Sequence, residues 1–485
     1  MNNTNLIKLL RSLDRDEFRR FKKFLQSPYY NSNPLVLKLY EVLKPFYPDF
    51  DSLKMTKERI FRRLFAGKKY HDGRMRNLIS DLKILTEEYL TDLELKKNKF
   101  EKKKVLNQAY AHRNLFSFFE KTTKHLIDEL EALPYKDIHV YNNEMWLKYE
   151  YFFHPQTDKY KKPIFTIEDV MEDMDRFFVL GKWQFGSEIK NRERIFANNV
   201  KPQFLDISMS ATDAFKKENP IFNLYENIFL LHDAEKNEQT YEIGKRQLEK
   251  FNDKISRDDG MNVLLNLRNY AIGKINKGLT AFHRELLALY KLGLELDLIL
   301  DNNKIKEADF TNIVSMGSLE HEFAWTKNFI EEYEKYLDDN VREDAKILGL
   351  AILYFHSKNY EAAMDQVGQH QFSNPVYQIS TKTLLVRVWF EQFFEDNDQY
   401  DFLLSQLEAF EKLIRRNNYL ATEKKEVYIN FILAIKKLAD LVYRKETREE
   451  IDKKMYRYLE NSKRMISKKW FEEKIDQIKN HHTSK

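Results

Sequence analysis

The amino-acid sequence predicts an all-α protein in which an N-terminal helical bundle is followed by an α-solenoid, a stack of degenerate helical hairpins. Glycine and proline are scarce: the 485 residues hold 12 and 10 of them, where an average protein of this length would hold about 58 in total. No proline occurs between Pro220 and Pro375 or after Pro375, which leaves room for long helices because proline interrupts them. Hydrophobic residues make up 42% of the chain, enough for a buried core.

The first helices are expected within residues 1–104, which we interpret as one basic module. Phe18, Phe21 and Phe24 recur at helical spacing behind Asp14, a candidate N-cap, and predict a helix over 17–25. Further helices are expected over 35–43, 57–65 and 75–90. Gly67 is expected to close the helix over 57–65, and Asp72 is the candidate N-cap of the helix over 75–90. The apolar positions of the third form a single face, made of Met75, Leu78, Ile79, Leu82, Leu85 and Leu90.

Residues 105–260 are expected to form irregular helical hairpins. Amphipathic segments alternate there with polar breaks, and the predicted helical segments are 105–131, 137–153, 166–198, 219–233 and 239–251. Two stretches that contain proline, 154–163 and 198–210, are predicted to be loops.

Residues 261–475 are expected to form helical repeats, with a polar tail over 476–485. The clearest unit is 341–370, which splits into two predicted helices around a turn at 357–359. The unit contains a small residue, an aromatic pair and a Y-x-x-A element at characteristic offsets. The residues of this pattern are Leu348, Ala351, Tyr354, Phe355, Tyr360, Ala363 and Val367. This unit resembles a tetratricopeptide repeat. Segments of similar length, expected to be weaker hairpins, are 306–337, 376–415 and 422–459.

Composition limits the chemistry and the location of the protein. The chain has no cysteine, which excludes disulfides, thiolate metal sites and cysteine nucleophiles. Its opening lacks the apolar core of a secretory signal, and its longest uncharged apolar stretches are about half a membrane span. We therefore expect a cytoplasmic protein with no membrane segment.

No linear motif predicts catalysis. The chain contains no G-x-x-x-x-G-K-[ST] phosphate loop, no G-x-G-x-x-G, no G-x-S-x-G and no H-E-x-x-H. We therefore predict no catalytic, cofactor-binding or metal-binding residues. An enzyme whose site is assembled from scattered residues stays open as an alternative, because such a site leaves no linear pattern.

Charge is distributed unevenly along the chain. Residues 1–104 carry 25 Lys and Arg against 14 Asp and Glu, a net charge of +11, so the remainder sums to −6 within the total of +5. The basic excess is greatest over 54–83, where ten basic residues face three acidic ones. Such a segment suits binding to nucleic acid or to an acidic protein partner.

Two predicted helices meet within 54–83 and could form a helix-turn-helix, whose second helix reads bases while neighbouring cations hold phosphates. Arginine can pair with guanine and asparagine with adenine. The candidate contact residues are Arg59, Arg62, Arg63, Lys68, Lys69, Arg74, Arg76 and Asn77. An ordinary helical hairpin with a solvated basic face would show the same residues.

The N-terminal segments resemble two groups of proteins. The pair TKERIFRRLF and RMRNLISDLKIL resembles regulators that join a winged-helix domain to a tetratricopeptide-like domain, although the turn here is longer and no strand pair follows. Together with EFRRFKKFLQSPYYN, it is also similar to an uncharacterised family of bacterial all-helical proteins over about ninety residues. That second resemblance implies no activity.

We expect a non-enzymatic scaffold that binds a protein or peptide partner, because helical-repeat surfaces are used mostly for binding. The alternative is a DNA-binding transcriptional regulator that uses the basic module on DNA and the repeats as a partner or sensor domain. The sequence indicates neither the identity of the partner nor an oligomeric state.

Overall fold

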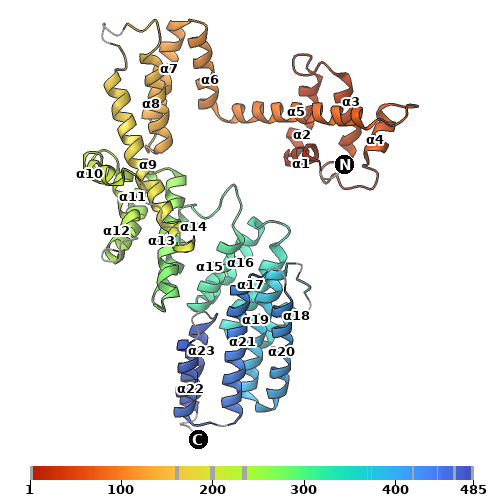
Figure 1. Cartoon of the computed structure of the whole chain (residues 1–485), viewed down its shortest axis with the longest axis vertical. Helices are drawn as coiled ribbons and strands as arrows, with labels where there is room; N and C mark the ends of the chain where they lie inside the picture. Colours follow the sequence, from red (N-terminus) through yellow and green to blue (C-terminus); the bar gives the residue numbers. More distant parts are fainter. Residues whose placement is uncertain are drawn as a thin grey trace. The chain divides into compact units, whose positions relative to one another are not determined.

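The computed structural model in Figure 1 describes residues 4–158, 163–196, 203–231, 237–368, 370–372, 374–417, 420–444, 446–461 and 466–481. Within these ranges the chain forms α-helices joined by turns and short 3-10 segments, and the one β-type pairing there is an isolated bridge between Asp301 and Lys304. The predicted all-α class is confirmed. No helix in the described ranges combines the length and the apolar character needed to cross a membrane.

Contacts divide the chain into two units. Unit 1 comprises Met1–Leu133 and Val140–Asp175, and unit 2 comprises Pro134–His139 and Arg176–Lys485. The boundaries near 104 and 260 expected from the sequence differ from this division and stay predictions.

Unit 1 begins with a bundle of five helices arranged around the longest of them. These are α1 (Asn5–Ser12), α2 (Arg15–Gln26), α3 (Pro34–Leu43), α4 (Lys57–Leu64) and α5 (Asp72–Lys97). The first four all contact α5. The buried row along α5 is Met75, Leu78, Leu82, Leu85, Tyr89 and Leu93, spaced so that one face of the helix enters the core. Helices α2 to α5 confirm the predicted ones; α1 was not predicted.

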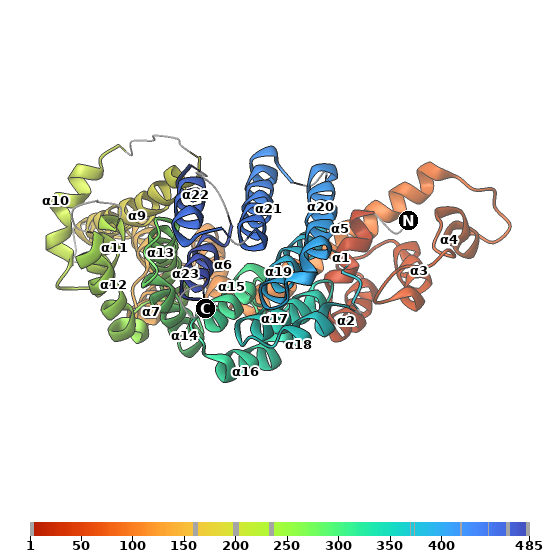
Figure 2. The same ribbon diagram turned by 90° about the horizontal axis from the view of Figure 1, so that it is seen from below.

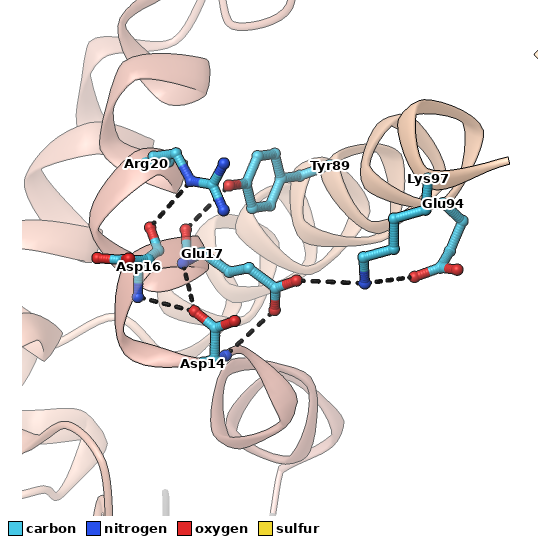
Figure 3. A network of polar contacts seen from close by, with 7 residues as sticks. All are labelled: Asp14, Asp16, Glu17, Arg20, Tyr89, Glu94 and Lys97. Atoms are coloured by element: carbon cyan, nitrogen blue, oxygen red, sulfur yellow. Dashed lines mark hydrogen bonds and ion pairs between the residues drawn. The ribbon is translucent and has the colours of Figure 1, made fainter. Parts of the chain in front are cut away.

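Helix α2 begins at the predicted cap. The Asp14 carboxylate accepts hydrogen bonds of 2.8 Å from the backbone N–H groups of Asp16 and Glu17, and the Glu17 carboxylate accepts one of 3.1 Å from the Asp14 N–H. This reciprocal capping box, drawn in Figure 3, occupies donors that a helix start leaves unpaired.

Glu17 also connects α2 to α5. Its backbone carbonyl accepts a 2.9 Å hydrogen bond from the Tyr89 hydroxyl, and its carboxylate lies 3.4 Å from the ammonium of Lys97, which also pairs with Glu94 at 3.1 Å (Figure 3). The Glu17 side chain is 13% exposed and that of Lys97 is 61% exposed, so solvent still screens this ion pair. One residue therefore both caps α2 and fixes the far half of α5 against it.

The cap of α5 is not the predicted one. His71 is the N-cap: its Nδ1 atom accepts a 3.1 Å hydrogen bond from the Arg74 N–H. Asp72 is the first helical residue, and its carboxylate accepts a hydrogen bond from the Tyr70 hydroxyl at 2.7 Å instead. At the other end, Asn98 closes α5 by donating its N–H to the Glu94 carbonyl and also caps the next helix.

The rest of unit 1 consists of α6 (Lys99–His112), α7 (Phe116–Glu131), α8 (Ile138–Phe152) from Val140 onward, and the first turns of α9 (Ile167–Phe196). The predicted segment 105–131 is two helices, because Asn114 has a left-handed φ of 57° that a helix cannot contain. Helices α6 and α7 pack together around a buried 2.9 Å hydrogen bond from Asn107 to Thr123.

Unit 2 contains the remaining helices, and each packs on its neighbours in sequence, as Figure 2 shows for α17, α18 and α19. Several also contact the next helix but one, among them α15 with α17 and α17 with α19. The helices are α10 (Leu205–Phe215), α11 (Pro220–Leu230), α12 (Asn237–Phe251), α13 (Arg257–Asn276), α14 (Phe282–Glu295), α15 (Glu307–Leu319), α16 (Phe323–Tyr333), α17 (Arg342–His356), α18 (Tyr360–Gly368), α19 (Pro375–Glu395), α20 (Tyr400–Arg416), α21 (Thr422–Tyr443), α22 (Arg448–Asn461) and α23 (Lys468–His481).

The predicted hairpin at 341–370 is confirmed as the pair α17 and α18. Its turn contains Lys358 in the left-handed region, with a φ of 61°, and Asn359, whose side chain accepts a hydrogen bond from the Ala362 N–H. Five of the seven pattern residues are buried, and the two tyrosines are half-buried; the buried ones are Leu348, Ala351, Phe355, Ala363 and Val367.

Two predicted irregular segments contain helix. The loop prediction for 198–210 is wrong over 205–210, because α10 begins at Leu205. The tail predicted over 476–485 begins as the last turns of α23, where Ile478 is buried; residues 482–485 lie outside the described ranges. Helix α23 is held to α19 by the buried Glu391 carboxylate, which accepts hydrogen bonds from Trp470 and Lys474.

Phe21→Ala should lower the free energy of unfolding of the N-terminal bundle by about 3–5 kcal/mol, because the substitution leaves a cavity among packed rings. Phe21 is fully buried, with its ring 5.0 Å from Tyr89 and 5.7 Å from Tyr40 between centroids. Hydrogen exchange of the amides in α2 and α5 measures the change. Phe118→Ala is the control: this ring is 59% exposed, so its loss should cost within about 0.5 kcal/mol. Equal protection in both variants would contradict the packing described.

Candidate functional site

The predicted contact residues lie at the start of α5 and on the helix before it. Arg59, Arg62 and Arg63 are on α4, Lys68 and Lys69 are in the turn, and the other three, Arg74, Arg76 and Asn77, are in the first turns of α5. All eight side chains are exposed. The structure therefore leaves every one of them accessible to a partner.

Three of the eight are engaged within the chain. The Arg59 guanidinium donates a 3.0 Å hydrogen bond to the Leu53 carbonyl, and the Arg74 guanidinium lies 4.1 Å from the centre of the Phe65 ring. The Nε atom of Arg76 lies 2.9 Å from the Asp72 carboxylate. A nucleic acid or an acidic protein would compete with these contacts.

Asp72 is the acidic centre of this surface. Its carboxylate accepts the Tyr70 hydroxyl at 2.7 Å and pairs with Arg76, and the ammonium of Lys57 lies 3.6 Å away. The hydrogen bond from Tyr70, followed by the two cations, lowers the pKa of Asp72. Desolvation and the same hydrogen bond raise the pKa of Tyr70 to about 12. At neutral pH the carboxylate is therefore charged and holds Arg76.

Four of the predicted residues keep their cationic groups without a partner. The side chains of Arg62, Arg63, Lys68 and Lys69 are exposed and form no hydrogen bond or ion pair with any part of the chain that the structure describes. We call these four residues the free basic surface. They can hold phosphates or carboxylates without first breaking an internal contact.

The exposed face of α5 changes sign along its length. After Arg74 and Arg76 it presents Asp81, Glu87 and Glu88 to solvent. The turn before α5, from Phe65 to His71, is seven residues long, whereas a helix-turn-helix has a turn of three or four residues. Only the first turns of α5 could enter a DNA groove without bringing these acids to the phosphates.

A second exposed surface lies on α8 and was not predicted. Trp146, Tyr149 and Phe153 are 51%, 42% and 49% exposed. Their spacing of three and four residues places them on one face of the helix. Neighbouring rings touch: the centroids of Trp146 and Tyr149 are 5.3 Å apart, and those of Tyr149 and Phe153 are 4.7 Å apart. The three rings form a continuous exposed row.

Two exposed methionines, Met171 and Met174, lie on the neighbouring helix α9. Tyr151 near the end of α8 contacts Phe165 just before α9, and Lys148 on α8 pairs with the buried Asp173 on α9 at 2.6 Å. The two helices therefore run antiparallel with Lys148 and Asp173 between them. A helix turns by about 100° per residue, so in an antiparallel pair the next residues, Tyr149 and Met174, point to the same side.

The combined surface is apolar. Met171 lies one turn before Met174, and the two are 60% and 57% exposed. We call Trp146, Tyr149, Phe153, Met171 and Met174 the aromatic–methionine face. Exposed apolar groups of this size mark binding sites more often than ordinary surface, and methionine adapts its shape to a partner.

Sequence reasoning missed this face because its spacing equals that of a buried row. Phe18, Phe21 and Leu25 of α2 have the same separations and are buried. The one signal in the sequence is the residue type: a tryptophan and a tyrosine carry polar atoms that suit an exposed or interfacial position. That signal does not separate the two cases by itself.

The described residues contain no group of three or more histidine and carboxylate side chains placed to hold a metal ion. The predicted absence of catalytic, cofactor-binding and metal-binding residues stays a prediction.

Comparison with known proteins adds no assignment. No model of a known protein family matches the chain, and no curated protein matches it. The resemblance of the first ninety residues to an uncharacterised family therefore stays a prediction.

Tyr70→Phe should raise the pKa of Asp72 toward its ordinary value of about 3.9, because the hydroxyl is the strongest influence that lowers it. NMR titration of the Asp72 side chain measures this. A lowered pKa means that the contacts of Asp72 stabilise the fold above the unfolded-state pKa and lose that effect as pH falls through the folded-state pKa. Tyr29→Phe, on a distant exposed tyrosine, is the control. An unchanged titration in Tyr70→Phe would contradict the hydrogen bond.

Proposed function

We propose that the chain is a non-enzymatic scaffold that binds a protein partner through the aromatic–methionine face, with a solenoid of degenerate tetratricopeptide-like hairpins following the basic N-terminal bundle. The exposed row of Trp146, Tyr149 and Phe153 is the observation that carries this proposal. These aromatic side chains have large apolar areas outside any core, and tryptophan and tyrosine are the residues most often responsible for binding energy at interfaces.

The pattern of helix contacts supports the solenoid part of the proposal. In unit 2, consecutive helices pair, and alternate helices such as α15, α17 and α19 also touch, as expected where helical hairpins stack. The small residues of the α17–α18 pair, Ala351 and Ala363, are buried, as the tetratricopeptide pattern requires.

The chemistry of the face favours one kind of partner, an amphipathic α-helix. All five residues lie on or directly after helices, whose backbone groups are already paired, so no strand can add to this surface. The five side chains carry no charge, which favours an equally apolar stripe on the partner. A helix satisfies its own backbone and presents such a stripe every three to four residues.

Selection from a displayed library of random peptides, each long enough for four helical turns, tests the proposal on the full chain. Bound peptides should be enriched in apolar residues at positions i, i+3, i+4 and i+7, and should become helical on binding by circular dichroism. Trp146→Ala combined with Tyr149→Ala should weaken them at least about tenfold, because interface aromatics contribute roughly 2 kcal/mol or more. Tyr29→Ala combined with Phe118→Ala removes two exposed rings elsewhere and should change nothing.

Three outcomes would contradict this proposal. The library could yield no enriched sequence, or it could yield proline-rich or charged sequences that bind elsewhere. Alternatively, sedimentation could show that the chain associates with itself and that Trp146→Ala abolishes this, in which case a second copy occupies the face.

The second candidate function is a DNA-binding regulator, and the free basic surface is the observation that favours it. Arg62, Arg63, Lys68 and Lys69 are accessible and have no partner in the described parts of the chain. Four phosphate contacts would suffice for salt-dependent binding to duplex DNA. The acidic face of α5 limits such binding to the turn and the helix start.

If the chain is a DNA-binding regulator, the affinity of the full chain for duplex DNA should fall as the salt concentration rises. A plot of the logarithm of affinity against the logarithm of salt concentration should have a slope of about −3.6, for four phosphate contacts. Arg62→Ala with Arg63→Ala should reduce that slope by about 1.8. Lys121→Ala with Lys124→Ala, two exposed cations on α7, is the control. Fluorescence anisotropy across a salt series measures all three, and an absence of binding at low salt would remove this candidate.

A further inference from the structure

Unit 2 contains a pocket of about 460 Å³, which is separate from both surfaces discussed above. Its size falls in the range of small-ligand sites. Three parts of the chain that are distant in sequence build it: residues 134–136, the turn that leads from α10 into α11, and the end of α12 with the short segment after it. A hydrogen bond of 2.7 Å from the Asn219 side chain to the Lys136 carbonyl joins the first two parts.

The charged side chains around this pocket are nearly all cationic. Four lysines line it, Lys136, Lys216, Lys217 and Lys254, against one acid, Glu218. The Glu218 carboxylate accepts a hydrogen bond of 3.2 Å from Arg176, a residue outside the lining, so its charge is already compensated.

The lysines of the pocket differ in whether their ammonium groups are paired with carboxylates. Lys216 is held by Asp213 and Glu226 at 2.8 Å and 2.7 Å. Lys217 and Lys254 are exposed, and their ammonium groups have no ion pair or hydrogen bond within the described ranges of the chain. Two ammonium groups at the pocket are therefore ready to take an anion.

Three carboxylates act on Tyr135 from outside the lining of the pocket. Burial, followed by the carboxylate of Asp137, raises the pKa of Tyr135, and Asp258 and Asp259 add smaller effects. None of these three acids lines the pocket. The N-terminus of α11, capped by Asn219, is also at the pocket, and the partial positive charge of a helix start adds to that of the lysines.

The remaining lining is partly apolar and aromatic. Tyr135, Phe251, Pro134 and Pro220 are among the lining residues, and aromatic side chains can hold the flat face of a ring. A phosphate ion alone would fill only a small part of the volume. We infer that this pocket binds a small phosphorylated molecule with a planar ring, of the nucleoside monophosphate class, with its phosphate at Lys217 and Lys254 and its ring against the aromatic residues.

Isothermal titration of the full chain with adenosine monophosphate, inorganic phosphate and adenosine tests the inference. The monophosphate should bind at least about tenfold more tightly than either part alone, because it gains both the charge-assisted contacts and the ring contacts. Lys217→Ala with Lys254→Ala should weaken it by about tenfold or more, while circular dichroism shows an unchanged fold, since both side chains are exposed.

The control is Lys277→Ala with Lys412→Ala, which removes two exposed cations of unit 2 that do not line the pocket; binding should be unchanged. Equal weakening in the control would reduce the effect to general surface charge and overturn the inference. Binding of adenosine as tight as that of the monophosphate would overturn it too, and so would inorganic phosphate binding as tightly, or no saturation by any of the three at millimolar concentration.

Discussion

The N-terminal bundle depends on a single buried row along α5, since its other four helices all pack against that helix. The row from Met75 to Leu93 faces α1 to α4 and supplies the apolar contact that none of those short helices could obtain alone, because isolated helices of eight to twelve residues are marginal in water. The capping box at Asp14 and the contacts of Glu17 then fix α2 against the same helix. The first turns of α5 are held by this packing, and they carry three of the candidate contact residues, Arg74, Arg76 and Asn77.

Much of the helical architecture is predictable from the sequence where the pattern is strong. Asp14 and the three phenylalanines of α2 specify that helix through a cap and a spacing that only a helix satisfies. Weaker signals failed: α1 has three buried apolar residues behind a polar start, and α10 follows a proline that favours a loop. The predicted N-cap of α5 is Asp72, whereas the observed N-cap is His71. The Asp72 carboxylate is instead bound by the Tyr70 hydroxyl, a contact that residue spacing alone does not reveal.

The sequence predicts which residues make up the candidate site, but it does not predict which of their charged groups are free to bind a partner. The sequence places eight basic or amide residues between Arg59 and Asn77, and the structure exposes them all. Which cations are free depends on contacts that form only on folding, such as the stacking of Arg74 on Phe65 and the pairing of Arg76 with Asp72. The exposure of Trp146 and Tyr149 could not be predicted for the same reason. It depends on which face of α8 packs against other helices, and a periodic sequence pattern does not indicate that.

Asn98 is the single residue between α5 and α6, and it caps both helices. Its N–H closes α5 on the Glu94 carbonyl at 2.9 Å, and its side chain accepts the Glu101 N–H of α6 at 3.0 Å. The direction of α6 therefore depends on the φ and ψ of this one residue, −96° and 91°. One inserted residue would rotate the faces of α6 by about 100° and would remove Asn107 from Thr123 on α7. At this junction the register between α5 and α6 is therefore fixed by a single residue.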